Sequence, residues 1–85
     1  MTSEDILVRI HKILTIDLDL AEGEEIAPDT NLIAEGFLDS INAMRLVSKI
    51  ESEFDTKIPP RDLVPANFLS EQAMADYLAR TLTPS

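Results

Sequence analysis

Apolar residues recur at helical spacing near the start of the chain, and this pattern predicts an amphipathic helix. Thr2 or Ser3 can cap its beginning, and the acidic residues Glu4 and Asp5 favour its positive end. The apolar stripe consists of Ile6, Leu7, Ile10, Ile13 and Leu14. The helical pattern fades from Thr15 onward.

The clearest helical pattern begins after Asp39, which is a good N-cap, and runs from Ser40 to about Phe54. At about 100° per residue, one face of this helix carries Ala43, Leu46, Val47, Ile50 and Phe54. Ile41 breaks the pattern, because it projects with Arg45 and Lys49, about 150° from the centre of the apolar face.

Two shorter stretches follow. The prolines Pro59, Pro60 and Pro65 limit the first to a short helical turn around Arg61 to Val64, after which we expect Phe68 and Leu69 to pack inward. Ser70 is the expected N-cap of a final helix that carries Glu71 in its first turn and ends before Pro84. Its apolar stripe is Met74, Tyr77, Leu78 and Leu82.

The segment from residue 17 to 39 predicts a long loop, since Gly23, Pro28 and Gly36 interrupt it. It contains no basic residue and eight acidic ones: Asp17, Asp19, Glu22, Glu24, Glu25, Asp29, Glu35 and Asp39. Its apolar residues are expected to pin it to the core: Leu18, Leu20, Ile26, Leu32, Ile33, Phe37 and Leu38. The whole pattern predicts an all-α fold, a small four-helix bundle of three main helices and one short one, in a single domain over residues 1–85.

Composition narrows the choice of partners. The chain has no Cys, and its formal net charge of −9 disfavours nucleic acid and anionic lipid as partners. Such a surface suits transient docking to basic patches on other proteins. The apolar runs are too short for a membrane span and the N-terminus does not resemble a secretory signal, so we expect a cytoplasmic monomer.

Catalytic groups are scarce. The single histidine, His11, lies at the edge of the first apolar stripe and is interpreted as a half-buried or surface residue. No nucleophile–base set, phosphate-binding glycine loop or zinc pattern is present, which argues against an enzyme. The stretch from Asp17 to Gly23 begins like a calcium loop, but Ala21 and Glu22 occupy positions where that loop requires an oxygen ligand and a glycine. No metal site is therefore expected.

The remaining candidate is the segment Gly36-Phe37-Leu38-Asp39-Ser40-Ile41. On structural grounds alone, Asp39-Ser40 is a good helix start. However, Ser40 opens the most amphipathic helix directly after the long loop. Its hydroxyl is expected to be exposed there, and the positive end of the helix favours an attached phosphate.

With these motifs the chain resembles the acyl carrier protein superfamily, which includes peptidyl and aminoacyl carriers. The resemblance covers nearly the whole chain and rests on Asp29 to Leu32, Gly36 to Ile41, Ile50 to Asp55, Ile58-Pro59 and Asn67 to Ser70. It implies a non-catalytic carrier. A phosphopantetheinyl transferase would attach 4′-phosphopantetheine from coenzyme A to Ser40, assisted by Asp39, and the cargo would be a thioester on the arm.

The resemblance also implies loading ligases and downstream synthases or transferases as partners. It further implies a space between the helices for an acyl chain, with Val47, Ile58, Leu63 and Phe68 as the expected lining. Ordinary core packing is the competing interpretation of these four residues.

One departure from fatty-acid carriers concerns the outward face of the second helix, which is not acidic. Asn42, Arg45 and Lys49 lie there. The two cations, together with Ile41 and Met44, form the expected docking surface. Alternatively, the two cations are merely solvated, or paired with Glu53 or Glu51. The mixed charge favours a specialised fatty-acid, polyketide or nonribosomal-peptide-type pathway. The alternative function is an unmodified acidic domain that mediates protein–protein contact.

Overall fold

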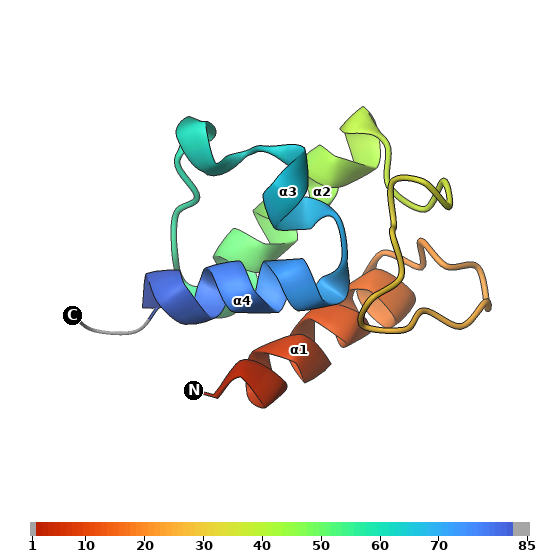
Figure 1. Ribbon diagram of the computed structural model, residues 1–85, viewed down its shortest axis with the longest axis horizontal. Coiled ribbons are helices and arrows are strands. Elements are labelled where there is room, and N and C mark those ends of the chain that lie inside the picture. The colour runs from red at the N-terminus through yellow and green to blue at the C-terminus, as the bar shows by residue number, and fades with distance from the viewer. Residues whose placement is uncertain (1, 83–85) are drawn as a thin grey trace.

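The computed structural model describes residues 2–82, which contain helices and no strand (Figure 1). The elements in chain order are α1 (Ser3–Lys12), the π-helical η1 (Ile13–Asp17), α2 (Ser40–Phe54), the 3-10 turn η2 (Pro60–Asp62), α3 (Pro65–Phe68) and α4 (Glu71–Leu82). The predicted all-α bundle of three main helices and one short helix is confirmed. None of the helices within the described range is both long and apolar enough to cross a membrane.

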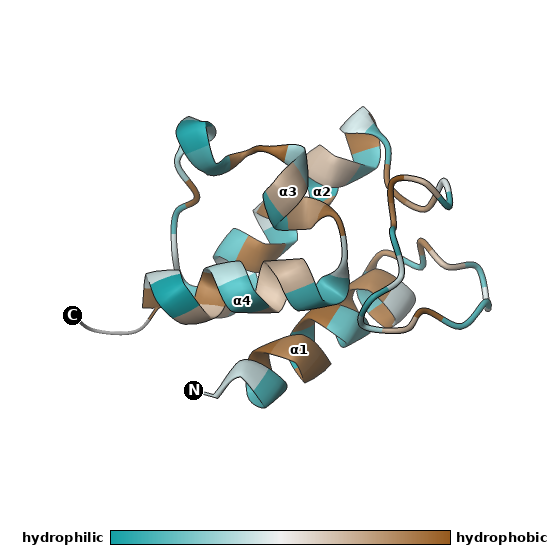
Figure 2. Ribbon diagram, in the orientation of Figure 1, coloured by the Kyte–Doolittle hydropathy of each residue, from teal (hydrophilic) through white to brown (hydrophobic). Residues whose placement is uncertain are grey.

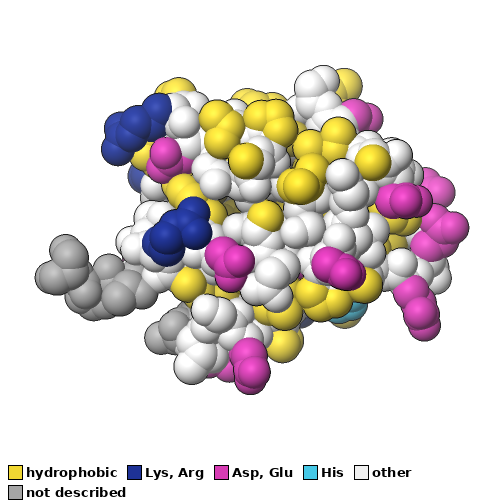
Figure 3. Space-filling model, in the orientation of Figure 1, with side chains coloured by type: hydrophobic (Ala, Val, Ile, Leu, Met, Phe, Trp, Pro, Cys, Tyr) yellow, Lys and Arg dark blue, Asp and Glu magenta, His cyan; other side chains and the backbone are white. Residues whose placement is uncertain are grey.

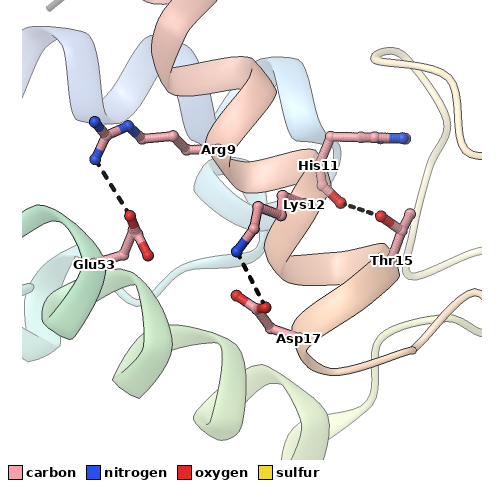
Figure 4. Close-up of polar contacts among 6 residues, drawn as sticks. All are labelled: Arg9, His11, Lys12, Thr15, Asp17 and Glu53. Atoms are coloured by element: carbon pink, nitrogen blue, oxygen red, sulfur yellow. Dashed lines mark hydrogen bonds and ion pairs between the residues drawn. The ribbon is translucent and has the colours of Figure 1, made fainter.

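The start of α1 is held by a reciprocal capping box. The Thr2 hydroxyl accepts a hydrogen bond from the Asp5 N–H at 3.1 Å, and Asp5 Oδ2 accepts one from the Thr2 N–H at 3.4 Å. At its other end α1 widens into η1, where the Thr15 hydroxyl donates to the His11 carbonyl at 2.7 Å (Figure 4). Helical structure therefore continues to Asp17, two residues beyond the point where the apolar pattern fades.

The core forms where α1 packs against α4, α3 against α4, and α2 against η1. Each main helix shows both apolar and polar bands along its length (Figure 2). On the predicted apolar face of α2, Leu46, Ile50 and Phe54 are buried, and Ala43 and Val47 are partly buried against them.

An ion pair joins α1 to the end of α2. Arg9 Nη1 lies 3.2 Å from Glu53 Oε2 (Figure 4), and the Arg9 guanidinium lies 5.9 Å from the centre of the Phe54 ring. The Glu51 carboxylate accepts a hydrogen bond from the Ile58 N–H at 2.8 Å. Both acidic side chains thus have other partners, and the alternative that they pair with the cations of α2 is wrong.

The segment between α2 and α4 differs from the prediction in two ways. The expected turn around Arg61 to Val64 is replaced by η2 at Pro60–Asp62 and by α3, which begins at Pro65. Proline is well suited to the first helical position, because its missing N–H would have no partner there. Phe68 is buried as expected, but Leu69 is 39% exposed, so the prediction that it packs inward is wrong.

The long loop is fastened to the junction of α3 and α4 at one end of the bundle (Figure 1). The Leu32 N–H donates to the Leu69 carbonyl at 2.8 Å, and the Gln72 N–H donates to the Pro28 carbonyl at 2.9 Å. Most of the predicted apolar anchors are buried or partly buried: Leu18, Leu20, Ile26, Leu32, Phe37 and Leu38. Ile33 is the exception at 42% exposed.

The first residue of α4 is a buried acid. Ser70 caps the helix as predicted, its hydroxyl accepting from the Ala73 N–H at 3.1 Å. Glu71 is only 1% exposed, and its Oε2 lies 2.7 Å from Nδ1 of His11. His11 itself is a surface residue, as expected, but the burial of its partner is not visible in the sequence.

Candidate functional site

Ser40 is the first residue of α2, and its side chain is exposed. The preceding Asp39 has an extended backbone and caps the helix, because its Oδ1 accepts from the Asn42 N–H at 2.8 Å. The Asp39 carbonyl accepts from the Ala43 N–H, also at 2.8 Å. Within residues 2–82 the Ser40 hydroxyl makes no hydrogen bond, so it is free to react.

The approach to Ser40 is fixed by a tight turn of the loop. Gly36 has a φ of +81°, a value that glycine adopts without strain. The chain then returns so that the Leu32 carbonyl accepts from both the Phe37 N–H at 2.9 Å and the Leu38 N–H at 3.1 Å. Because Leu32 and Leu38 are buried, Ser40 lies two residues beyond an anchored position.

An apolar cavity of about 440 Å³ opens beside Ser40. It lies between α2, α3 and the loop, where apolar side chains gather on the surface (Figure 3). Its lining consists of Ile33, Leu38, Asp39, Ser40, Ala43, Met44, Val47, Leu63, Val64, Pro65 and Phe68. The volume lies within the range of small-molecule pockets, about 300–1,000 Å³.

Three of the four residues expected to line such a space do so: Val47, Leu63 and Phe68. Ile58 does not, since it is 6% exposed and belongs to the core. The lining also includes Ile33 and Val64, which sequence reasoning missed. Their incomplete burial, at 42% and 41% exposed, is explained by their place at the cavity.

The outward face of α2 carries the residues expected to dock partners. Ile41 and Met44 are 73% and 63% exposed. Arg45 Nη1 donates to Asn42 Oδ1 at 3.3 Å, and no ion pair involves Arg45 or Lys49 within the described part of the chain. The apolar and basic groups of this face are therefore available to another molecule.

The acidic loop forms the neighbouring surface (Figure 3). A polar hollow there is lined by Asp19, Glu22, Glu24 and Glu35, with Arg45 at its α2 side. In residues 2–82 no three acidic or histidine side chains are grouped so that they would hold a metal ion. Ala21, which stands where a calcium loop requires an oxygen ligand, is buried, with 2% of its surface exposed.

A comparison with protein families supplies the missing assignment. The family model described as "Phosphopantetheine attachment site" matches residues 5–78. The chain belongs to this family. Its members are carriers rather than catalysts, and they hold a covalently attached 4′-phosphopantetheine. The protein therefore interacts with a phosphopantetheinyl transferase and with the enzymes that use the carried group.

The described residues fit this cofactor. Its attachment requires an exposed hydroxyl, and a phosphodiester is stabilised by the unpaired N–H groups and positive potential of a helix N-terminus. Ser40 offers both, at the mouth of an apolar cavity. The thiol that carries the cargo belongs to the cofactor, so a chain without Cys is compatible with this chemistry.

Proposed function

We propose that Ser40 carries the phosphopantetheine arm and that the protein delivers thioester-bound acyl or aminoacyl intermediates to partner enzymes. The observation that carries this proposal is the position of Ser40, which is exposed at the first residue of α2 and without a hydrogen-bond partner in the described chain. Asp39 directs the helix start so that the hydroxyl faces outward, and its carboxylate is the group expected to assist the transfer.

The cavity favours acyl over aminoacyl cargo. Its lining is apolar except for Asp39 and Ser40 at the mouth. A hydrocarbon chain placed there is removed from water, which stabilises it by about 0.8 kcal/mol per buried CH₂ group. An ammonium group in the same place would lose its hydration, and the apolar part of the lining offers it no partner.

The experiment for the attachment site is an intact-mass measurement. Unmodified protein is incubated with coenzyme A and a broad-specificity phosphopantetheinyl transferase. Wild type should gain the mass of one arm, and Ser40→Ala should gain none. Ser48→Ala is the matched control, since Ser48 is an exposed serine on the same helix, and it should be modified like wild type. Modification of Ser40→Ala would contradict the assignment.

We further propose that Ile41, Met44, Arg45 and Lys49 dock the partner enzymes of a specialised fatty-acid, polyketide or nonribosomal-peptide-type pathway. Exposed apolar side chains supply interface energy, and the charges beside them tune partner choice and encounter rate. Here the cations face outward on a protein of net charge −9, next to the acidic loop. The partner surface is expected to be acidic where it meets α2 and basic where it meets the loop.

Reversing the two cations tests this docking surface. Arg45→Glu/Lys49→Glu should lower kcat/KM with the native loading enzyme by about tenfold at low salt, and by less at high salt. The matched control Lys57→Glu/Arg80→Glu makes the same change of net charge at exposed cations that are not part of α2. Equal kinetics for the two double variants would contradict a specific role for the basic face.

A further inference from the structure

One wall of the apolar cavity is built from a segment with little regular structure. Residues 59–68 supply Leu63, Val64, Pro65 and Phe68 to the lining, and their only helical parts are the short elements η2 and α3. Leu63 and Val64 are 38% and 41% exposed. Core packing therefore does not fix the middle of this wall.

The opposite wall is held much more firmly. It consists of Ala43, Met44 and Val47 on α2, whose inner residues Leu46 and Ile50 are 0% and 1% exposed. A long helix with a fully packed inner face moves as a unit. Of these two facing walls, the segment 59–68 is therefore the one that can change the width of the cavity; the loop adds Ile33 and the buried Leu38 to the lining.

One side-chain hydrogen bond ties the middle of this segment to α4. The Tyr77 hydroxyl donates to Asp62 Oδ2 at 2.7 Å, and the Asp62 carbonyl accepts from Asn67 Nδ2 at 2.8 Å, which joins η2 to α3. In the described residues no other side-chain hydrogen bond or ion pair joins positions 59–67 to α1, α2 or α4. Asp62 directly precedes Leu63, so its position sets that of the wall.

Tyr77 contacts the segment 59–68 at two points, through its ring and through its hydroxyl. The ring packs near Phe68, with centroids 6.5 Å apart and ring planes at 45°. The hydroxyl holds Asp62. Burial, and next the hydrogen bond to Asp62, raise the pKa of Tyr77 above its ordinary value of 10.0, so the phenol remains a proton donor at neutral pH.

We propose that the Tyr77–Asp62 hydrogen bond sets the width of the cavity and thereby selects the acyl chains that the carrier shelters. This inference rests on the proposed role of the cavity in holding the cargo. With the bond formed, Leu63 and Val64 stay close to α2. When it opens, the segment moves away from α2 and admits a longer or bulkier chain. Tyr77 and Asp62 are positioning residues, since neither lines the cavity.

The first test uses the unmodified protein and therefore does not depend on the arm. Tyr77→Phe keeps the ring and removes only the hydroxyl. Methyl relaxation measured by NMR should show greater motion at Leu63 and Val64, with no change at Val47 on the opposite wall. Loss of one net hydrogen bond shifts an opening equilibrium by about two- to tenfold.

Two acidic residues provide the matched pair for this test. Asp62→Ala should reproduce the effect of Tyr77→Phe, and Asp76→Ala, at an exposed acid of α4, should not. Asp62→Asn keeps an acceptor and should give an intermediate effect, because hydrogen bonds to charged groups are about twice as strong as neutral ones. It serves as the second variant if Tyr77→Phe fails to fold. Unchanged motion of Leu63 and Val64 in the folded variants overturns the proposal.

The second test measures selection directly. The arm is loaded with saturated acyl chains from acetyl to decanoyl, loading is verified by intact mass, and thioester cleavage by hydroxylamine is followed. We expect Tyr77→Phe to change the cleavage rates of the longer chains by about two- to tenfold and to leave the acetyl rate unchanged. An equal change at every length, or no dependence on length in wild type, overturns the proposal. Failure of Ser40 to accept the arm is seen earlier, in the mass, and contradicts the proposed function instead.

Discussion

Glu71 is the most deeply buried charged side chain in the described part of the chain, at 1% exposed. Its Oε2 lies within hydrogen-bond distance of Nδ1 of His11, at 2.7 Å, and the His11 side chain is itself 48% exposed. Desolvation raises the pKa of Glu71 above its ordinary value of 4.5, and the hydrogen bond and charge of His11 oppose that shift without cancelling it. The ionised carboxylate therefore lowers the free energy of unfolding.

The raised pKa determines how stability depends on pH. The folded protein binds the proton of the Glu71 carboxyl more tightly than the unfolded chain does. The stabilisation of the folded state by this proton is therefore fully present below pH 4.5 and is lost as the pH rises through the raised pKa. Glu71→Gln removes the charge and keeps the shape and an acceptor for His11. We expect this variant to be at least as stable as wild type at neutral pH and to lose the corresponding part of the pH dependence.

The opposite change removes the partner and leaves the carboxylate buried. Hydrogen bonds to charged groups contribute about 1.5–3 kcal/mol, and because His11 is half exposed we expect His11→Ala to cost about 1.5 kcal/mol, near the lower end. For a domain of this size that corresponds to a decrease in Tm of about 6–12 °C. In the Glu71→Gln background the same substitution should cost less than about 1 kcal/mol, since no unpaired charge remains.

A double-mutant cycle measures these quantities. Urea denaturation of wild type, the two single variants and the double variant is followed by far-UV circular dichroism from roughly pH 4 to pH 8. If Glu71→Gln is less stable than wild type by more than about 1 kcal/mol at neutral pH and keeps its pH slope, the ionised carboxylate is stabilising and the reasoning is wrong.

Two further predictions concern the ends of α2. Asp39→Ala should lower the free energy of unfolding by about 1 kcal/mol through loss of the N-cap, whereas Asp39→Asn should keep the cap. Denaturation and arm transfer are measured on both variants, which separates the effect of the cap from that of the charge. Equal transfer by Asp39→Asn and wild type would contradict a role of the carboxylate in the transfer. Asp55 has a φ of 49° at the end of α2, so Asp55→Gly should stabilise the protein by about 0.5 kcal/mol. Asp76→Gly, inside α4, should instead destabilise it by about 0.3 kcal/mol, since Asp is already a poor helix former. A lower Tm for Asp55→Gly would contradict the assumed backbone strain.

The best-predicted part of the molecule is the helix that carries the site. Its pattern predicts Asp39 as the N-cap and a helix from Ser40 to about Phe54, and the structure has these bounds. Capping and apolar periodicity depend on residues that are close together in the sequence, so both can be predicted from the sequence alone. Ser40 is exposed as expected, but its place after a polar cap does not ensure this, since Glu71 follows the cap Ser70 in the same way and is buried.

The cavity was only partly predictable, because its walls come from distant parts of the chain. Val47 and Phe68 were expected in the lining, but Ile33 and Val64 belong to segments whose local pattern is irregular. Pro65 was interpreted as the end of a helical turn, although it begins one. A proline restricts the backbone equally in both roles, so the local sequence does not decide between them.

The contacts that hold the site together converge on α4, which contributes no residue to the cavity lining. Its Gln72 N–H holds the loop at Pro28, its Glu71 binds His11 of α1, and Tyr77 holds Asp62, which precedes the lining residue Leu63. Each contact joins residues more than a dozen positions apart, so no local sequence pattern predicts it. Since the loop leads to Ser40 and the wall faces it, α4 determines the geometry of a site that it does not touch. Substitutions on α4 that leave the fold intact should therefore alter how the cargo is held before they alter whether the arm is attached.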